Sequence, residues 1–143
     1  MSRGRAARGG VGELLWRAGR LYERGWDEAL ARVGMTRSQA ALLSLLEQEP
    51  GLSGSELARR AHLSIPGVAA SLVQMEEKGW VRRKPHRSHR RLLEVFLSAQ
   101  GKRRLGRARA ALRSVDAGAM RGMSAPARAA LKAALNHLSE RLS

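Results

Sequence analysis

The chain of 143 residues is long enough for one domain with a hydrophobic core, and its richness in Ala, Leu and Arg with only 3% aromatic residues favours a mostly helical protein over a β-sandwich. The formal net charge of +15 indicates a polyanionic partner, and the lack of cysteine excludes disulfides, thiolate metal sites and sensing by thiol oxidation. No apolar run reaches the roughly 20 residues that cross a bilayer, so we expect a cytoplasmic protein without a membrane partner.

The N-terminal part combines a basic arm with a long helix. Residues 1–10 are basic and lack the apolar stretch of a signal peptide, so we expect a disordered arm there. Apolar side chains recur at helical spacing over residues 11–33, which predicts an amphipathic helix. Gly34 is well placed to end this helix.

Two capping boxes predict the helices that follow. Thr36 lies three residues before Gln39, and this pair predicts the start of a helix that stops before Pro50. Ser53 and Glu56 have the same spacing and open a short helix of about two turns. These signatures predict two helices in close succession.

A third helix and a β-hairpin complete this part of the chain. Ser64 caps the helix, Pro66 lies in its first turn, and Gly79 ends it. Residues 80–97 then predict two strands around a Pro-containing tip. The second strand has the required period of two in its apolar residues Leu93, Val95 and Leu97.

The hairpin is the most cationic segment of the chain. Between Arg82 and Arg91 lie six Lys or Arg residues, two His residues and no carboxylate. A clustered basic stripe of this kind indicates contact with nucleic acid, although a solvated basic loop is the alternative. His86 and His89 have no third ligand among their cationic neighbours, so we expect no metal site.

The C-terminal part predicts two more helices. Ser98 caps the first, and the second starts at Ser124 and presents leucines at spacings of three and four: Leu131, Leu135, Leu138 and Leu142. These two helices and residues 11–34 carry apolar stripes that the small middle domain cannot cover. We therefore expect dimerisation through residues 11–34 and 98–143, with an intramolecular bundle as the alternative.

The order of three helices and a hairpin over residues 35–97 is that of a winged helix-turn-helix DNA-binding domain with a two-stranded β-wing. Four segments give this order a specific character: Met35-Thr-Arg-Ser-Gln39, Leu52-Ser-Gly-Ser-Glu-Leu-Ala58, Met75-Glu-Glu-Lys-Gly-Trp-Val-Arg-Arg83 and Leu97-Ser-Ala-Gln-Gly101. Together with the Arg90-Arg91 pair they resemble the multiple antibiotic resistance regulator (MarR) family over about residues 11–142.

This resemblance implies a homodimeric transcriptional regulator, in particular a repressor. Its first, fifth and sixth helices would form the dimer interface, and its winged domains would bind double-stranded DNA at a pseudo-palindromic operator. Half-sites about one helical turn apart, roughly 10 bp, fit such a dimer. The resemblance also implies release from DNA by a small aromatic or anionic effector.

The candidate DNA-binding residues form three groups. On the recognition helix they are Ser64, Pro66, Gly67, Ala70, Ser71 and Gln74; in the wing they are Arg82, Lys84, Arg87, Arg90 and Arg91; at helix starts, where capping is the alternative role, they are Arg37, Ser38, Ser53 and Ser55. In the first group only Ser64, Ser71 and Gln74 can donate or accept a hydrogen bond, so we expect modest or shape-based specificity.

The wing departs from the family at one position. By the resemblance, Arg91 takes the place of the arginine that enters the minor groove, and His89 stands where relatives have an Asp that holds this arginine. We therefore expect Arg91 to be less ordered. Arg87 and Arg90 would add attraction to phosphates.

A candidate effector pocket lies on the first helix, where the resemblance places a ligand-lined cleft. It comprises Trp16, Arg20, Tyr22 and Trp26. Packing in the core or the dimer interface is the alternative role of these aromatic side chains.

No catalytic set and no cofactor motif is visible in the sequence, so we expect a protein that is not an enzyme and needs no cofactor. Two alternatives to a sequence-specific regulator remain at this point. One is an architectural or nucleoid-type DNA-binding protein with low sequence specificity, which the apolar recognition helix and the high charge both allow. The other is a winged-helix module for protein interaction.

Overall fold

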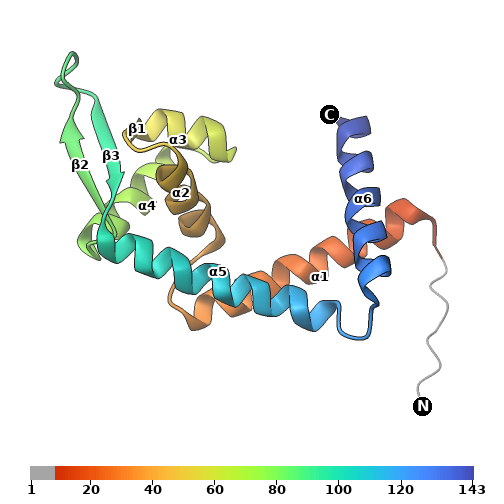
Figure 1. Cartoon of the computed structure of the whole chain (residues 1–143). Helices are drawn as coiled ribbons and strands as arrows, with labels where there is room; N and C mark the ends of the chain where they lie inside the picture. The colour runs from red at the N-terminus through yellow and green to blue at the C-terminus, as the bar shows by residue number, and fades with distance from the viewer. Residues whose placement is uncertain (1–8) are drawn as a thin grey trace.

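The computed structural model describes residues 9–143, so most of the predicted arm lies outside the described residues. The elements in chain order are α1 (Val11–Arg32), α2 (Arg37–Gln48), β1 (Leu52–Ser53), α3 (Gly54–Ala61), α4 (Ile65–Glu77), β2 (Val81–Pro85), β3 (Leu93–Leu97), α5 (Ala99–Ala119) and α6 (Ala125–Leu142). This mostly helical winged helix-turn-helix confirms the predicted fold class (Figure 1).

The predicted caps start the helices. Thr36 Oγ1 accepts a hydrogen bond from the Gln39 amide, and Gln39 Oε1 accepts one from the Thr36 amide, both at 3.1 Å. Ser53 and Glu56 form the second capping box, and the hydrogen bonds from Ser53 lower the pKa of the Glu56 carboxyl. The remaining predicted caps, Ser64, Ser98 and Ser124, each accept from the amide three residues on.

The sheet has one strand more than the sequence predicts. β2 and β3 form the antiparallel hairpin, and β1 pairs with the other edge of β3, so the order is β1-β3-β2. Val95 lies at the centre, opposite Leu52 on one side and Arg83 on the other. The hairpin extends beyond the helices as the wing (Figure 1).

The core lies between the helices α2 to α4, the base of the wing and the first half of α5. Its fully buried side chains include Leu42, Leu43, Leu46, Leu57, Val68, Met75, Val81, Val95 and Leu105. Trp80 is buried at the base of the wing, where Lys78 and Arg104 lie over its ring at 4.7 and 5.3 Å from the centroid. Because α5 contributes Leu105 and Ala108 to this core, its first half is part of the winged domain.

The first and last helices are much less covered. α1 lies alongside α5 and buries only Ala29 and Leu30, whereas α6 follows α5 at the end remote from the winged domain and buries no residue (Figure 1). Over residues 9–143 no helix is both long and apolar enough to cross a membrane. The polypeptide therefore builds one complete core and leaves a helical extension with open apolar surface.

The start of α5 is packed tightly against the wing. A Cβ placed on Gly101 would lie 2.0 Å from the carbonyl oxygen of Trp80, and backbone cannot yield easily at this point. Gly106, five residues further along the same helix, has open space around it.

We predict that Gly101→Ala destabilises the protein by about 2–3 kcal/mol, because the added methyl group overpacks this contact. Gly106→Ala is the matched control and should stabilise by about 0.5–1 kcal/mol through its higher helix propensity. Urea denaturation at one fixed protein concentration measures both. Equal unfolding midpoints for Gly101→Ala and the wild type would contradict the close contact.

Candidate nucleic-acid interface

The recognition helix α4 has one buried face and one open face. Val68, Leu72 and Met75 pack into the core, while the opposite side exposes small or apolar residues, among them Pro66, Gly67, Ala69, Ala70 and Val73. Ser64 Oγ accepts the amide of Gly67 at 3.1 Å, so this hydroxyl acts first as the helix cap. A surface of this kind can approach a base edge closely but offers few hydrogen bonds.

Gln74 provides the amide on this surface. Its side chain is exposed, and its Oε1 accepts a hydrogen bond from Gln39 Nε2 at 3.3 Å. Ser71, one turn earlier, is half-buried. The structure therefore links the predicted base-reading residue to the start of α2, a contact that the sequence analysis missed.

The cations on strand β2 of the wing are either paired with a carboxylate or exposed. Arg83 points to α4, where its Nε donates to Glu76 Oε2 at 2.6 Å. Arg82 and Lys84 alternate with it and are exposed, and Lys84 Nζ lies 5.4 Å from the ring centroid of Phe96. Arg83 is thus neutralised within the chain, in contrast to the two residues that the sequence analysis selected.

The wing tip carries the exposed cations. Arg87, Arg90 and Arg91 are exposed, and no carboxylate in residues 9–143 lies within 4.0 Å of their guanidinium groups. His86 shapes the turn, since its Nδ1 accepts the Ser88 amide at 3.0 Å and its Nε2 lies 3.4 Å from Glu94 Oε1. The described part of the chain contains no cluster of three metal-ligating side chains. The tip therefore presents unneutralised charge to a polyanion.

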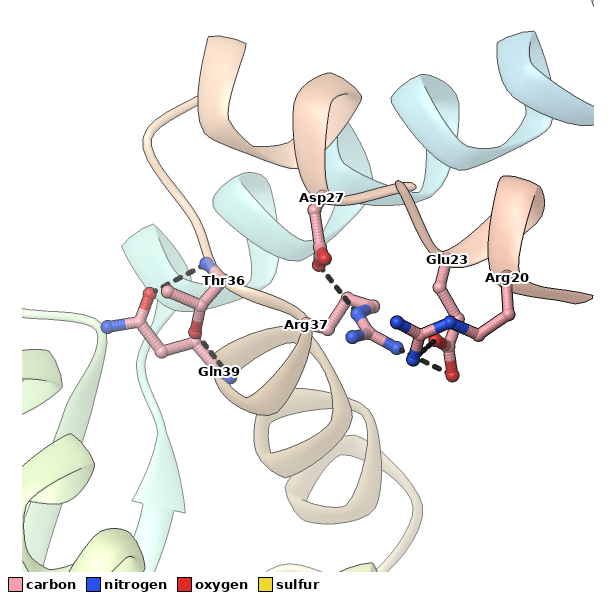
Figure 2. Close-up of polar contacts among 6 residues, drawn as sticks. All are labelled: Arg20, Glu23, Asp27, Thr36, Arg37 and Gln39. Atoms are coloured by element: carbon pink, nitrogen blue, oxygen red, sulfur yellow. Dashed lines mark hydrogen bonds and ion pairs between the residues drawn. The ribbon is translucent and has the colours of Figure 1, made fainter. Parts of the chain in front are cut away.

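Arg37 differs from the wing-tip arginines because its guanidinium is paired with carboxylates. Its guanidinium turns toward α1, where Nε donates to Asp27 Oδ1 at 2.6 Å and Nη1 lies 3.6 Å from Glu23 Oε1 (Figure 2). The hydrogen bond to Asp27 raises the pKa of Arg37. This arrangement argues for a role in joining α1 to α2 rather than for a phosphate contact.

The candidate serines at helix starts differ in exposure and in whether they cap a helix. Ser53 is only 5% exposed, and its hydroxyl accepts the Glu56 amide, so it serves as a cap. Ser38 is half-buried near the start of α2, and Ser55 is exposed at the start of α3. Of these three, Ser55 is the residue best placed to meet a phosphate.

The four candidate effector residues meet in one groove. Trp16, Arg20, Tyr22 and Trp26 line a mostly apolar groove of about 810 Å³ between α1, the end of α5 and α6. The rings of Tyr22 and Trp26 meet edge to face with their centroids 5.5 Å apart.

The groove is lined by one cation, Arg20, and two carboxylates, Glu23 and Asp116. Glu23 lies 3.7 Å from Arg20, and Asp116 also lines the groove. Burial, and then the charge of Asp116, raise the pKa of Tyr22. An acidic ligand would therefore need to displace Glu23 from Arg20.

A second, smaller cleft of about 330 Å³ lies between α1, α2 and α5. Trp26 lines it too, together with Arg37 and Arg109. Both arginines are already paired with carboxylates, since Arg109 Nη1 lies 2.6 Å from Glu47 Oε2. The larger groove has more than twice this volume and three aromatic side chains, so it is the better candidate for a ligand site.

Comparisons with known proteins agree with this geometry. The MarR family model matches residues 33–92. The HTH-type transcriptional repressor Rv2887 of Mycobacterium tuberculosis is 34% identical over 128 residues, which cover 90% of this chain and 92% of the relative.

Solved structures of the M. tuberculosis MarR family protein Rv2887 are also similar. Its complex with DNA has a TM-score of 0.77 at 31% identity and covers 91% of this chain and 98% of that chain. Its complex with salicylic acid has a TM-score of 0.72 at 33% identity and covers 93% of this chain and 98% of that chain.

We predict that joint replacement of Arg87, Arg90 and Arg91 by Ala weakens binding to any duplex and flattens its salt dependence. Three cations lost from each protomer of a dimer should lower the slope of log K against log salt by about 5. Fluorescence anisotropy at about 50 to 200 mM salt measures the slope.

Arg37→Ala is the informative comparison, because it also removes a cation but one already paired with α1. Its slope should equal that of the wild type. A fall of about 2 would show that Arg37 contacts phosphate in each half-site.

Proposed function

The chain belongs to the MarR family of DNA-binding transcriptional regulators, and from this premise we propose that it represses transcription as a homodimer on a pseudo-palindromic operator. The single observation that carries the proposal is the pairing of an open recognition helix with a wing tip whose three arginines have no carboxylate partner in residues 9–143. Phosphates would supply the missing negative charge, and α4 would enter the major groove.

The helical extension supports the homodimer. α6 buries no residue, yet it carries Leu131, Leu135 and Leu142 at 38%, 38% and 82% exposure. α1 adds the exposed side chains of Trp16 and Leu21. We propose that a second copy covers these exposed apolar side chains. Dimerisation would then use residues 11–34 and the part of residues 98–143 that lies outside the winged core, and DNA binding would use residues 35–97.

A small aromatic acid is the effector class that we propose. The similar protein Rv2887 has been solved with salicylic acid, and the groove in this chain combines indole and phenol rings with Arg20. An aromatic ring would pack against Trp16 and Trp26, and its carboxylate would pair with Arg20 in place of Glu23.

The proposed role is that of a cytoplasmic regulator without catalytic activity, since it must reach DNA and its relatives are transcriptional repressors. The architectural alternative has one observation in its favour, the scarcity of polar side chains on the open face of α4. The two functions differ in the ratio of specific to non-specific affinity.

We predict that the protein binds the DNA flanking its own gene at least about 10³-fold more tightly than random duplex of the same length at the same salt concentration. A ratio near one would favour the architectural role. Footprinting on the flanking DNA should reveal two protected half-sites about 10 bp apart, as a two-fold dimer requires.

We predict that salicylate, used as a probe, binds the free protein and that Arg20→Ala weakens this binding by about tenfold or more, because a charge-assisted hydrogen bond is lost. Arg24→Ala is the matched control, since Arg24 lies one turn further along α1 and pairs with Glu28. Isothermal titration calorimetry measures both. Equal losses in the two variants would argue against the groove as the site.

A further inference from the structure

We propose that Gln39, a residue outside the recognition helix, determines which atoms of Gln74 face the DNA and thereby which bases this position accepts. The inference rests on the proposed function, since it assigns a role within DNA recognition. It follows from two hydrogen bonds, one from Thr36 to Gln39 and one from Gln39 to Gln74, which fix the direction of two side-chain amides in turn.

The first amide is held by the start of α2. Gln39 is only 4% exposed, and its side chain belongs to the capping box with Thr36. The Thr36 amide can only donate, so the atom that it meets at 3.1 Å must be the oxygen of Gln39. Figure 2 shows this oxygen turned to Thr36 and the nitrogen turned away from α1. Helix capping therefore sets the direction of a buried amide.

The second amide takes its direction from the first. Gln39 Nε2 carries only donors, so the atom of Gln74 that lies 3.3 Å away must be the acceptor Oε1. Rotation of the Gln74 amide by 180° would bring two NH₂ groups together and leave Gln39 Nε2 without this acceptor. The Nε2 group of Gln74 therefore lies on the side away from Gln39, with its donors available.

A Gln74 side chain held this way would present its N–H groups to the DNA. In the major groove, guanine offers two acceptors, N7 and O6, whereas cytosine offers only the N4 amino donor. The position that Gln74 reads should thus favour guanine and disfavour cytosine on the contacted strand. Ser64 serves as the helix cap and Ser71 is half-buried, whereas Gln74 is exposed and has the longer side chain, so we assign a large share of the hydrogen-bond readout by α4 to Gln74.

The variant Gln39→Glu tests this inference without removing the cap. A carboxylate can still accept the Thr36 amide, and Glu is a normal residue at this position of a capping box. Its second oxygen accepts but cannot donate, so the Gln74 amide should turn over and offer Nε2 to it. Oε1 of Gln74 would then face the DNA and accept from cytosine N4.

The measurement is selection from a duplex library with randomised half-sites at pH 8, where the new carboxyl is ionised. At one position in each half-site we expect the ratio of guanine to cytosine to fall by at least about fivefold relative to the wild type. The added negative charge should weaken binding to all sequences alike, so this ratio, not the affinity, is the readout. Thermal unfolding should show that the variant remains folded at the temperature of the selection, despite the cost of burying a carboxylate.

Gln74→Ala and the double variant, which combines Gln39→Glu with Gln74→Ala, complete a double-mutant cycle. Gln74→Ala should abolish the preference at the same position, and Gln39→Glu should then change nothing further in its background. The inference is overturned if Gln39→Glu leaves the ratio of guanine to cytosine unchanged. It is also overturned if the wild type selects specific sequences and Gln74→Ala changes the base preference at no half-site position. A wild-type protein that binds no duplex at all would instead refute the proposed function.

Discussion

The close contact between the start of α5 and the base of the wing is the constraint on which the rest of the structure depends. The Trp80 carbonyl accepts the Ser98 amide at 2.9 Å, and the Trp80 amide donates to the Met75 carbonyl at the end of α4. Gly101 allows the helix to approach this backbone. The recognition helix, the wing and the helix that leads to α6 are thereby joined at one point, so a displacement of α5 moves both DNA-binding elements together.

A second junction attaches α1 to this unit through cations. Arg104 Nη2 donates to the Val33 carbonyl at 2.7 Å, and Arg37 bonds to Asp27. Glu23, which also contacts Arg37, lines the candidate ligand groove and pairs with Arg20. An acid that takes Arg20 from Glu23 would alter the charge around Arg37. If a ligand binds as proposed, this chain of ion pairs would connect the groove to the winged domain, with each exposed pair contributing modestly.

Patterns among residues close in sequence predicted more of the structure than could be predicted for contacts between distant residues. Every helix start expected from a Ser or Thr cap is present, because the capping hydrogen bonds join residues three positions apart and are legible in sequence. β1 has only two residues and no periodicity, so nothing in the sequence could reveal it. The partners of Arg37 and Gln74 lie 10 and 35 residues away, and only the packing of α1, α2 and α4 brings them together. The four candidate effector residues line one groove because they share one helix, and their role in ligand binding stays a prediction.

Affinity and sequence specificity would come from different elements of the protein. In the proposed complex the wing would supply charge, which acts on every sequence, whereas α4 would offer the Gln74 amide, oriented by Gln39, in each half-site. Contacts in two separate half-sites contribute nearly additively to the free energy of binding, so a tenfold preference at each would give a dimer about a hundredfold. Further discrimination would come from DNA shape, because the small exposed residues Pro66, Gly67 and Ala70 would allow α4 a close approach to the groove.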